Sequence, residues 1–368
     1  MQEEFDRDQS EEFLQNEAFA AEFAEKERVE KAKTKLGFAA SRIGLASAFL
    51  IAAWLLAIVV VTIVCGAFGV AGVEFFDKYA LVINEITLIV GIAAALPILL
   101  SVPRVNLHKN KMPFGKFMKI LAIGFGASYI GNLIGTVLLS FWNASTGNSV
   151  GDELTTFLYG MDPLMMFLFA GVLGPILEEL FFRKLVIDRL RVFGELIAIL
   201  LSAFLFSLFH MSASQLLYTF TFGVMMGYIY CRTGNYWLTA LAHMIFNTVS
   251  GIIPMLFLPK LTAYEAAMQE LEASLPADAS TDALAEMMLP VLEEYGPVLG
   301  LYGLYALMIL ALNIVGIVLL FKNFKKFEEK KGEFSLPFKT SAKTVFKTAG
   351  IIVYTVFLGI MTVTSLFG

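Results

Sequence analysis

The chain has 368 residues, of which 58% are hydrophobic and 16% are charged, and its formal net charge at pH 7 is −5. Soluble domains carry about a quarter charged residues, so this composition excludes an ordinary soluble globular protein and indicates a membrane protein. The basic residues lie in loops that membrane topology explains, so nothing in the composition supports a nucleic-acid partner. The two cysteines, Cys65 and Cys231, lie far apart in apolar segments, and we expect no disulfide framework.

Residues 1–36 are charged and precede the first apolar run. They begin acidic ("MQEEFDRDQSEEF") and become basic ("KERVEKAKTK"), which predicts a charged, partly amphipathic helix. No short basic head runs directly into an apolar stretch with a small-residue cleavage site. We therefore expect no removable signal peptide.

Nine apolar runs follow, most of them about as long as a helix needs to cross a bilayer, roughly 20 residues. We place them at 43–65, 80–102, 118–142, 161–182, 195–211, 215–231, 236–257, 297–321 and 345–367. The sequence therefore predicts an all-α polytopic membrane helix bundle with about eight to nine transmembrane helices.

The loops between these runs differ in charge. Basic residues collect at 26–42, 104–119, 183–191 and 322–347, whereas 66–79 and 143–157 are poor in them and the acidic segment 264–296 has none. Because Lys and Arg concentrate in cytoplasmic loops, this pattern predicts a multi-pass protein with a cytoplasmic N-terminus. The acidic segment is then expected outside, as two short helices broken near Pro276.

Two adjacent carboxylates, Glu178 and Glu179, stand at the end of an apolar run in "GPILEELFFRKL". Charge at membrane depth is costly and by default marks a functional site. Glu179 precedes Arg183 by four residues, the spacing and order that favour an ion pair on a helix. Neighbours on a helix diverge by about 100°, so Glu178 is left without a local partner and is free to act as a general base. A purely structural charge cluster is the alternative interpretation.

The three histidines differ in their surroundings. His108 lies in the basic loop "PRVNLHKNKMP" and is predicted to be a solvated surface residue. His210 ends the run "LSAFLFSLFH", one helical turn after Phe206. His243 and Asn247 share a helix face in "LTALAHMIFNTVSG". A buried imidazole and a buried amide must each find polar partners in a low dielectric, so His210, His243 and Asn247 are candidate site residues.

The ordered set "EELFFR", "FSLFH" and "HMIFN" resembles the CPBP family of intramembrane proteases, the Abi or CAAX prenyl endopeptidase group that includes the Rce-type enzymes. The resemblance covers roughly residues 160–256. It implies an endopeptidase that hydrolyses a peptide bond near or within the membrane, in a bacterial plasma membrane. By motif position it implies these roles: Glu178 and His210 activate water, His243 and Asn247 bind the oxyanion, and Glu179, Arg183 and Phe206 support them.

The resemblance leaves the cofactor open. Glu178, His210 and His243 are three protein ligands that suit zinc with one open position for water, and a metal-free mechanism uses the same residues. Lipids and a peptide or membrane-protein segment are the expected partners. Two other functions stay open: a non-catalytic membrane protein for bacteriocin self-immunity, and a transporter that relays protons through Glu and His.

The motifs and the charge pattern suggest five regions. These are a cytoplasmic charged segment (1–36), N-terminal transmembrane helices (37–158), a CPBP-like catalytic core (159–257), an acidic extramembrane segment (258–296) and C-terminal transmembrane helices (297–368). One difficulty follows from the predicted crossings, which place Glu178 near the cytoplasmic end of its helix and His210 near the external end of the next. Shared catalysis requires different helix boundaries or a broken helix, for which Pro175 and the "HMSASQ" link are the candidates.

Overall fold

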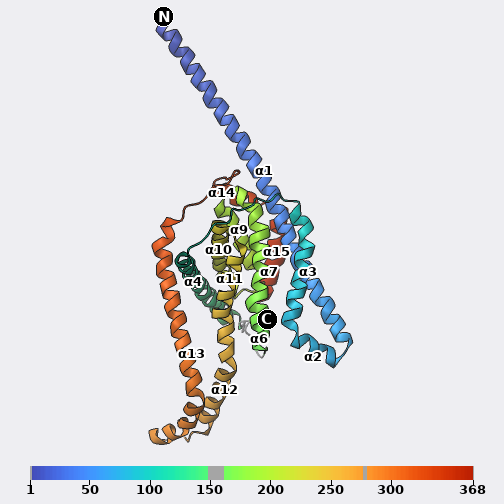
Figure 1. Cartoon of the computed structure of the whole chain (residues 1–368), viewed down its shortest axis with the longest axis vertical. Coiled ribbons are helices and arrows are strands. Elements are labelled where there is room, and N and C mark those ends of the chain that lie inside the picture. Colours follow the sequence, from blue (N-terminus) through green and yellow to red (C-terminus); the bar gives the residue numbers. More distant parts are fainter. Residues whose placement is uncertain (1, 148–160, 277–279, 368) are drawn as a thin grey trace.

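The computed structural model describes residues 2–147, 161–276 and 280–367, and every regular element in these ranges is helical, as predicted (Figure 1). The longer helices are α1 (Gln2–Ala67), α2 (Val70–Lys78), α3 (Ala80–Leu100), α4 (Phe114–Thr146), α9 (Glu195–Phe209), α10 (Leu216–Thr233), α11 (Tyr236–Asn247), α12 (Ile253–Ser274), α13 (Thr281–Asn323), α14 (Phe338–Val345) and α15 (Ala349–Thr364).

One helical path between 163 and 193 changes its winding several times. It consists of α6 (Pro163–Met165), π-helical η1 (Met166–Leu173), α7 (Gly174–Glu179), π-helical η2 (Leu180–Ile187), α8 (Asp188–Leu190) and 3-10 helical η3 (Arg191–Phe193). A further π-helical segment, η4 (Thr248–Ile252), joins α11 to α12, and a 3-10 turn, η5 (Phe324–Lys326), ends α13. Short π-helical segments are frequent at functional sites, and three of them surround the motif residues here.

Six helices of the described residues are long and apolar enough to cross a membrane. They are Glu17–Ala67, Ala80–Leu100, Phe114–Thr146, Pro163–Phe193, Tyr236–Ser274 and Thr281–Asn323, and the bent pair α14–α15 makes a seventh if it counts as one span. The predicted runs at 195–211 and 215–231 do not reach this standard. With 15 residues, α9 rises only about 22 Å against a hydrocarbon core of about 30 Å.

Both shorter helices are largely buried inside the bundle. Along α9, 12 of its 15 residues are buried, which makes it the most enclosed helix around the motif residues. The predicted eight to nine crossings therefore correspond to six or seven helices of spanning length, arranged around α9 and α10.

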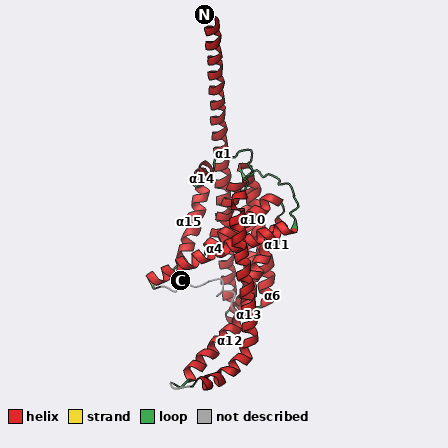
Figure 2. Ribbon diagram, turned by 90° about the vertical axis from the view of Figure 1, so that its left-hand side faces the viewer, coloured by secondary structure: helices red, strands yellow, loops and turns green. Residues whose placement is uncertain are grey.

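The basic loops meet at one end of the bundle. Backbone hydrogen bonds join Val105 to Asp188 (2.7 Å) and Phe334 to Val192 (3.0 Å). The acidic segment lies at the opposite end, where α12 and α13 project away from the bundle (Figures 1 and 2). The helical structure of the acidic segment is interrupted between Ser274, where α12 ends, and Thr281, where α13 begins, which is near Pro276 as predicted. The two helices of this segment are the ends of the long helices α12 and α13 and not two short separate helices.

A turn at Gly194 brings the motif helices together. Gly194 has φ 115°, a conformation that side chains with a Cβ rarely adopt. Glu178 lies 16 residues before this glycine and His210 lies 16 residues after it. The two residues therefore reach comparable depth on neighbouring antiparallel segments. The sequence-based placement of Glu178 at a helix end was wrong, because the helical path continues to Phe193.

Candidate active site

The Glu179–Arg183 ion pair predicted from the sequence is present and completely buried. Arg183 Nε lies 2.9 Å from Glu179 Oε2, and both side chains are fully inaccessible to solvent. Arg183 also donates through Nη1 to Ser202 Oγ at 2.7 Å, and that hydroxyl donates to the Phe182 carbonyl at 2.8 Å. These bonds tie the segment around α7 to α9. A charged pair is tolerated at this depth because each charge has a partner and further hydrogen bonds.

His243 of α11 lies between the two glutamates. Its Nδ1 donates to Glu179 Oε1 at 3.2 Å, and its Nε2 lies 3.7 Å from Glu178 Oε2. Because Glu179 accepts the Nδ1 proton, the orientation of the ring is fixed and Nε2 faces Glu178. Glu179 therefore contacts both Arg183 and His243. The contact with Arg183 was predicted from the sequence, and the contact with His243 was not.

Glu178 is the most accessible carboxylate of this cluster. Its side chain is 18% exposed, whereas that of Glu179 is fully buried. Its Oε2 has no hydrogen-bond partner among the described residues. The unpartnered oxygen is buried within a side chain that is partly exposed, so the carboxylate has free acceptor capacity for a water molecule.

His210 reaches the same region through aromatic contacts. Its ring centroid lies 4.7 Å from that of Phe206, and the Phe206 centroid lies 5.9 Å from that of His243. His210 Nδ1 donates to the Phe206 carbonyl at 2.9 Å. In the neutral ring this leaves Nε2 as a proton acceptor. His108, by contrast, is exposed in its loop, as predicted.

Asn247 follows His243 by one turn at the end of α11. Its Nδ2 donates to the Ala170 carbonyl of η1 at 3.1 Å. An amide nitrogen carries two N–H groups, so one donor stays available. The bond to Ala170 also anchors α11 to the π-helical segment that precedes α7.

A third buried carboxylate, Glu85 of α3, is part of this neighbourhood, and sequence reasoning missed it. Glu85 is 5% exposed, its Oε1 accepts from Asn84 at 3.3 Å, and its Oε2 has no partner among the described residues. A Cβ atom at Gly174 would lie 3.2 Å from Glu85 Oε1, and Gly174 precedes Glu178 by one helical turn. Two buried carboxylates in one neighbourhood disfavour each other's charged form. The available signal was an acidic residue inside the apolar run "LVINEITLIV".

The proposed zinc ligands do not form a ligand set as they are placed. Ligands at about 2.0–2.2 Å from one zinc must all converge on a single point. Glu178 and His243 approach each other, but no group of three His, Cys, Asp or Glu side chains in the described part of the chain is arranged to hold a metal ion. We therefore derive no step through a metal.

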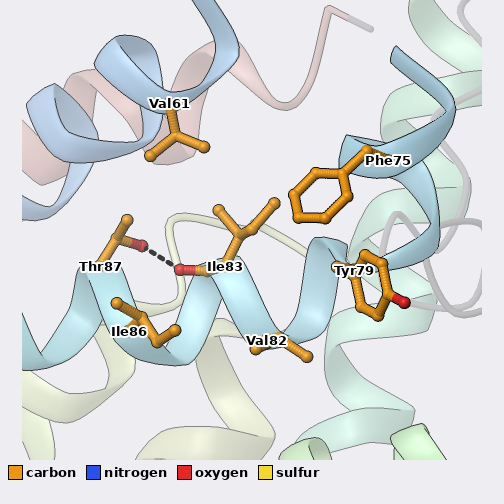
Figure 3. Close-up of a pocket in the computed structure, with 7 residues that line it drawn as sticks. All are labelled: Val61, Phe75, Tyr79, Val82, Ile83, Ile86 and Thr87. Carbon is orange, nitrogen blue, oxygen red and sulfur yellow. Dashed lines mark hydrogen bonds between the residues drawn. The ribbon is translucent and has the colours of Figure 1, made fainter. Parts of the chain in front are cut away.

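A cavity of about 330 Å³ lies between α1, α2 and α3, and no motif residue lines it (Figure 3). It is lined by Val61, Phe75, Tyr79, Val82, Ile83, Ile86 and Thr87. The Thr87 hydroxyl donates to the Ile83 carbonyl at 2.8 Å. Because no charged side chain lines this cavity, we assign no chemistry to it.

The segment that carries the motifs also matches known proteins. The family described as "Type II CAAX prenyl endopeptidase Rce1-like" matches residues 160–249. The "Putative membrane peptidase YdiL" of Bacillus subtilis (strain 168) is 30% identical over 92 residues, which are 25% of this chain and 38% of that protein. No solved structure matches the chain. Together the two matches support a CPBP-type family for this chain, through the segment that contains both glutamates, Arg183, His210, His243 and Asn247.

Proposed function

We propose that the chain is an intramembrane endopeptidase of the CAAX-processing type, which hydrolyses a peptide bond near or within a bacterial plasma membrane. The observation that carries this proposal is the unpartnered, partly exposed Glu178 carboxylate facing His243, whose other nitrogen is held by Glu179. The match of residues 160–249 to Rce1-like endopeptidases supports the same reaction class.

In this proposal Glu178 and His210 activate the attacking water. Glu178 takes a proton from the water as its oxygen attacks the carbonyl carbon of the peptide bond. The His210 ring offers Nε2 as a second acceptor because Nδ1 is engaged by the Phe206 carbonyl. The same proton is then delivered to the leaving amine when the C–N bond breaks, so the enzyme returns to its starting state.

His243 and Asn247 then bind the negative oxygen that forms on the carbonyl carbon. The free N–H of the Asn247 amide is one donor. Nε2 of His243 donates when the ring is protonated, and the Glu179 carboxylate at Nδ1 stabilises that imidazolium. Donors fixed in place before the reaction are worth most in a site that excludes water. In this arrangement Glu179 is a positioning residue that acts through His243.

The substrate is proposed to be a peptide precursor or a segment of another membrane protein. The matched region spans 38% of the curated relative, so the activity of the whole chain is itself part of the proposal. The test is to compare membrane peptides from cells that lack the gene, carry it, or carry Glu178→Gln. New N-termini that require the gene and disappear with Glu178→Gln support an endopeptidase. Identical peptide sets in all three strains contradict it.

A further inference from the structure

A lysine-lined groove lies between α1 and α14, far along the sequence from the proposed catalytic residues. It encloses about 420 Å³ and is lined by Lys33, Lys339, Thr340, Lys343, Thr344 and Lys347. Lys339 and Lys343 are four residues apart on α14, so they share one face of that helix, and Lys347 follows in the turn just after it. The two threonines lie beside them and add hydroxyl groups to the same groove.

The groove is held in a fixed shape by its packing. Val345 of α14 is fully buried, and Thr344 packs beside Gly37 of α1, where an added Cβ would be in ordinary van der Waals contact with Thr344 Cγ2 at 3.8 Å. Just beyond α14, the Gly350 backbone N–H donates to Ser41 Oγ of α1 at 3.3 Å. The lysine side chains therefore project from a rigid support.

The charges in the groove are not balanced within the described part of the chain. Lys33 pairs with Glu30 at 2.6 Å. Lys339, Lys343 and Lys347 form no ion pair with any described acidic residue. Lys339 and Lys343 repel each other as like charges four residues apart on a helix, and Lys347 adds a third positive charge to the same groove. An anion bound between them relieves that repulsion.

The surroundings favour the phosphate of a lipid over a free anion. The axis of α14 bends by 72° from that of the apolar helix α15. Two large apolar side chains at the ends of α14, Phe338 at its start and Phe346 just after its last residue, are each 50% exposed. A short helix with lysines on one face and exposed aromatic residues on another is typical of a helix lying in the membrane interface. In Figure 1, α14 lies beside α1 at the end of the bundle from which the N-terminal part of α1 projects.

We propose that this groove binds the phosphate group of an anionic phospholipid at the end of the bundle that carries the basic loops. The lysines contact the phosphate oxygens, the Thr340 hydroxyl donates a further hydrogen bond, and the exposed phenylalanines contact the acyl chains. Basic pockets between membrane helices are a recognised site for anionic headgroups. This proposal is independent of the chemistry assigned to Glu178.

The test uses the purified full chain in an uncharged detergent, titrated with dioctanoyl phosphatidylglycerol. Binding is followed by the rise in the thermal midpoint, since a ligand that binds only the folded state stabilises it. The triple variant Lys339→Gln, Lys343→Gln, Lys347→Gln is expected to bind at least roughly tenfold more weakly, because three of the positive charges that attract the anionic headgroup are lost. Replacing the same three lysines by arginine keeps the charge and is expected to keep the affinity.

The matched control removes three exposed lysines at the same end of the bundle, Lys109, Lys111 and Lys116, by the same change to glutamine. Its affinity is expected to stay close to that of the unmodified chain. Equal losses in the two glutamine variants, or no response to phosphatidylglycerol, would overturn the proposal. A response of the same size to dioctanoyl phosphatidylcholine or to inorganic phosphate overturns the assignment to an anionic lipid. If the glutamine triple variant does not fold, Lys343→Gln alone and the arginine variant decide the question.

Discussion

At the scale of single residues, the adjacent glutamates differ because their neighbours differ. Spacing along the helix was enough to predict that Glu179 pairs with Arg183, and the pair is present with N–O distances of 2.9 and 3.3 Å. The contact of His243 with Glu179 was not predictable in the same way. It joins residues 64 positions apart, and it depends on how α11 packs against α7.

The change Glu178→Gln tests the general base directly. Glutamine keeps the size of the side chain but cannot take a proton from water. Hydrolysis is expected to fall by about 10²–10⁴-fold, the range typical of lost general-base catalysis. Glu178 has no partner at Oε2 and sits at the accessible side of the cluster, so folding and membrane insertion should be unchanged. Near-normal turnover in a well-folded variant would remove the catalytic assignment.

The change Glu179→Gln acts on stability and on activity by separate routes. It leaves Arg183 buried without its counter-charge, which costs up to about 3–5 kcal/mol of folding free energy. It also removes the carboxylate that holds His243. Adding Arg183→Met to Glu179→Gln is expected to restore part of the thermal stability, while activity stays low.

This double variant separates the two contacts of Glu179. Thermal unfolding and peptide hydrolysis are measured on the single variants and on the double variant under the same conditions. Recovery of activity together with stability would mean that Glu179 acts only through Arg183, and the positioning role proposed for it at His243 would be lost.

Glu85 could not be found from the motifs, because it lies on α3, outside the segment that matches known proteins. Its Oε2 is buried without a partner, so a charge there is not compensated. Glu85→Gln keeps an oxygen that can accept from Asn84 and removes the charge. It is expected to raise the free energy of unfolding by at least about 1 kcal/mol, because an uncompensated buried charge costs more than a neutral buried amide. A lower thermal midpoint in this variant would mean that a cation or a proton donor balances Glu85 in the folded protein.

At the scale of elements, the two helical segments on either side of the turn at Gly194 were predicted only in part. The sequence predicts that the apolar run 161–182 ends before Arg183, because charged residues follow it. In the structure the helical path continues to Phe193, and the charged side chains of Arg183, Asp188 and Arg189 are buried with partners. Arg189 Nε donates to the Leu99 carbonyl at 2.7 Å, and the Tyr230 hydroxyl donates to Asp188 at 2.6 Å. Charges that are satisfied by distant residues cannot be distinguished from a solvated loop in the sequence alone.

The turn at Gly194 sets the relative depth of the two motif helices, and Gly194→Ala tests it. A Cβ there would require a strained backbone and would lie 3.0 Å from Ser335 Oγ and 3.1 Å from Glu329 Oε1. The variant is expected to lose about 1–3 kcal/mol of folding free energy, measured by thermal or denaturant unfolding. The matched control is Gly115→Ala in α4, where a Cβ meets nothing within 4 Å. Equal stability of the two variants would show that the turn tolerates a side chain.

At the scale of the whole molecule, the basic and acidic segments that alternate along the sequence lie at opposite ends of the bundle. The basic loops 101–113 and 324–337 each bond to the region around Asp188 and Val192, so they lie at one end. The acidic helices projecting from the other end complete the polarity of the molecule (Figure 1). Charge alternation predicted this segregation because it depends only on the order of loops. The number of spanning helices was less predictable, since α9 is apolar yet too short and is enclosed by its neighbours.

The orientation of this polarity in the membrane is the last prediction. Lysine and arginine collect on the cytoplasmic side of membrane proteins, so the end with the basic loops should face the cytoplasm. Single cysteines at exposed positions, Lys109→Cys in the basic loop and Ala273→Cys in the acidic hairpin, are reacted with a membrane-impermeant maleimide. Ala273→Cys is expected to react in intact cells, and Lys109→Cys only after permeabilisation. The native Cys65 and Cys231 are buried, so the unmodified chain supplies the background. Reaction of both positions from the same side would contradict the topology. It would also place the lysine groove of α14 and the acidic ends of α12 and α13 on one side of the membrane. They lie at opposite ends of the bundle, so a chain that spans the bilayer cannot have both on one side.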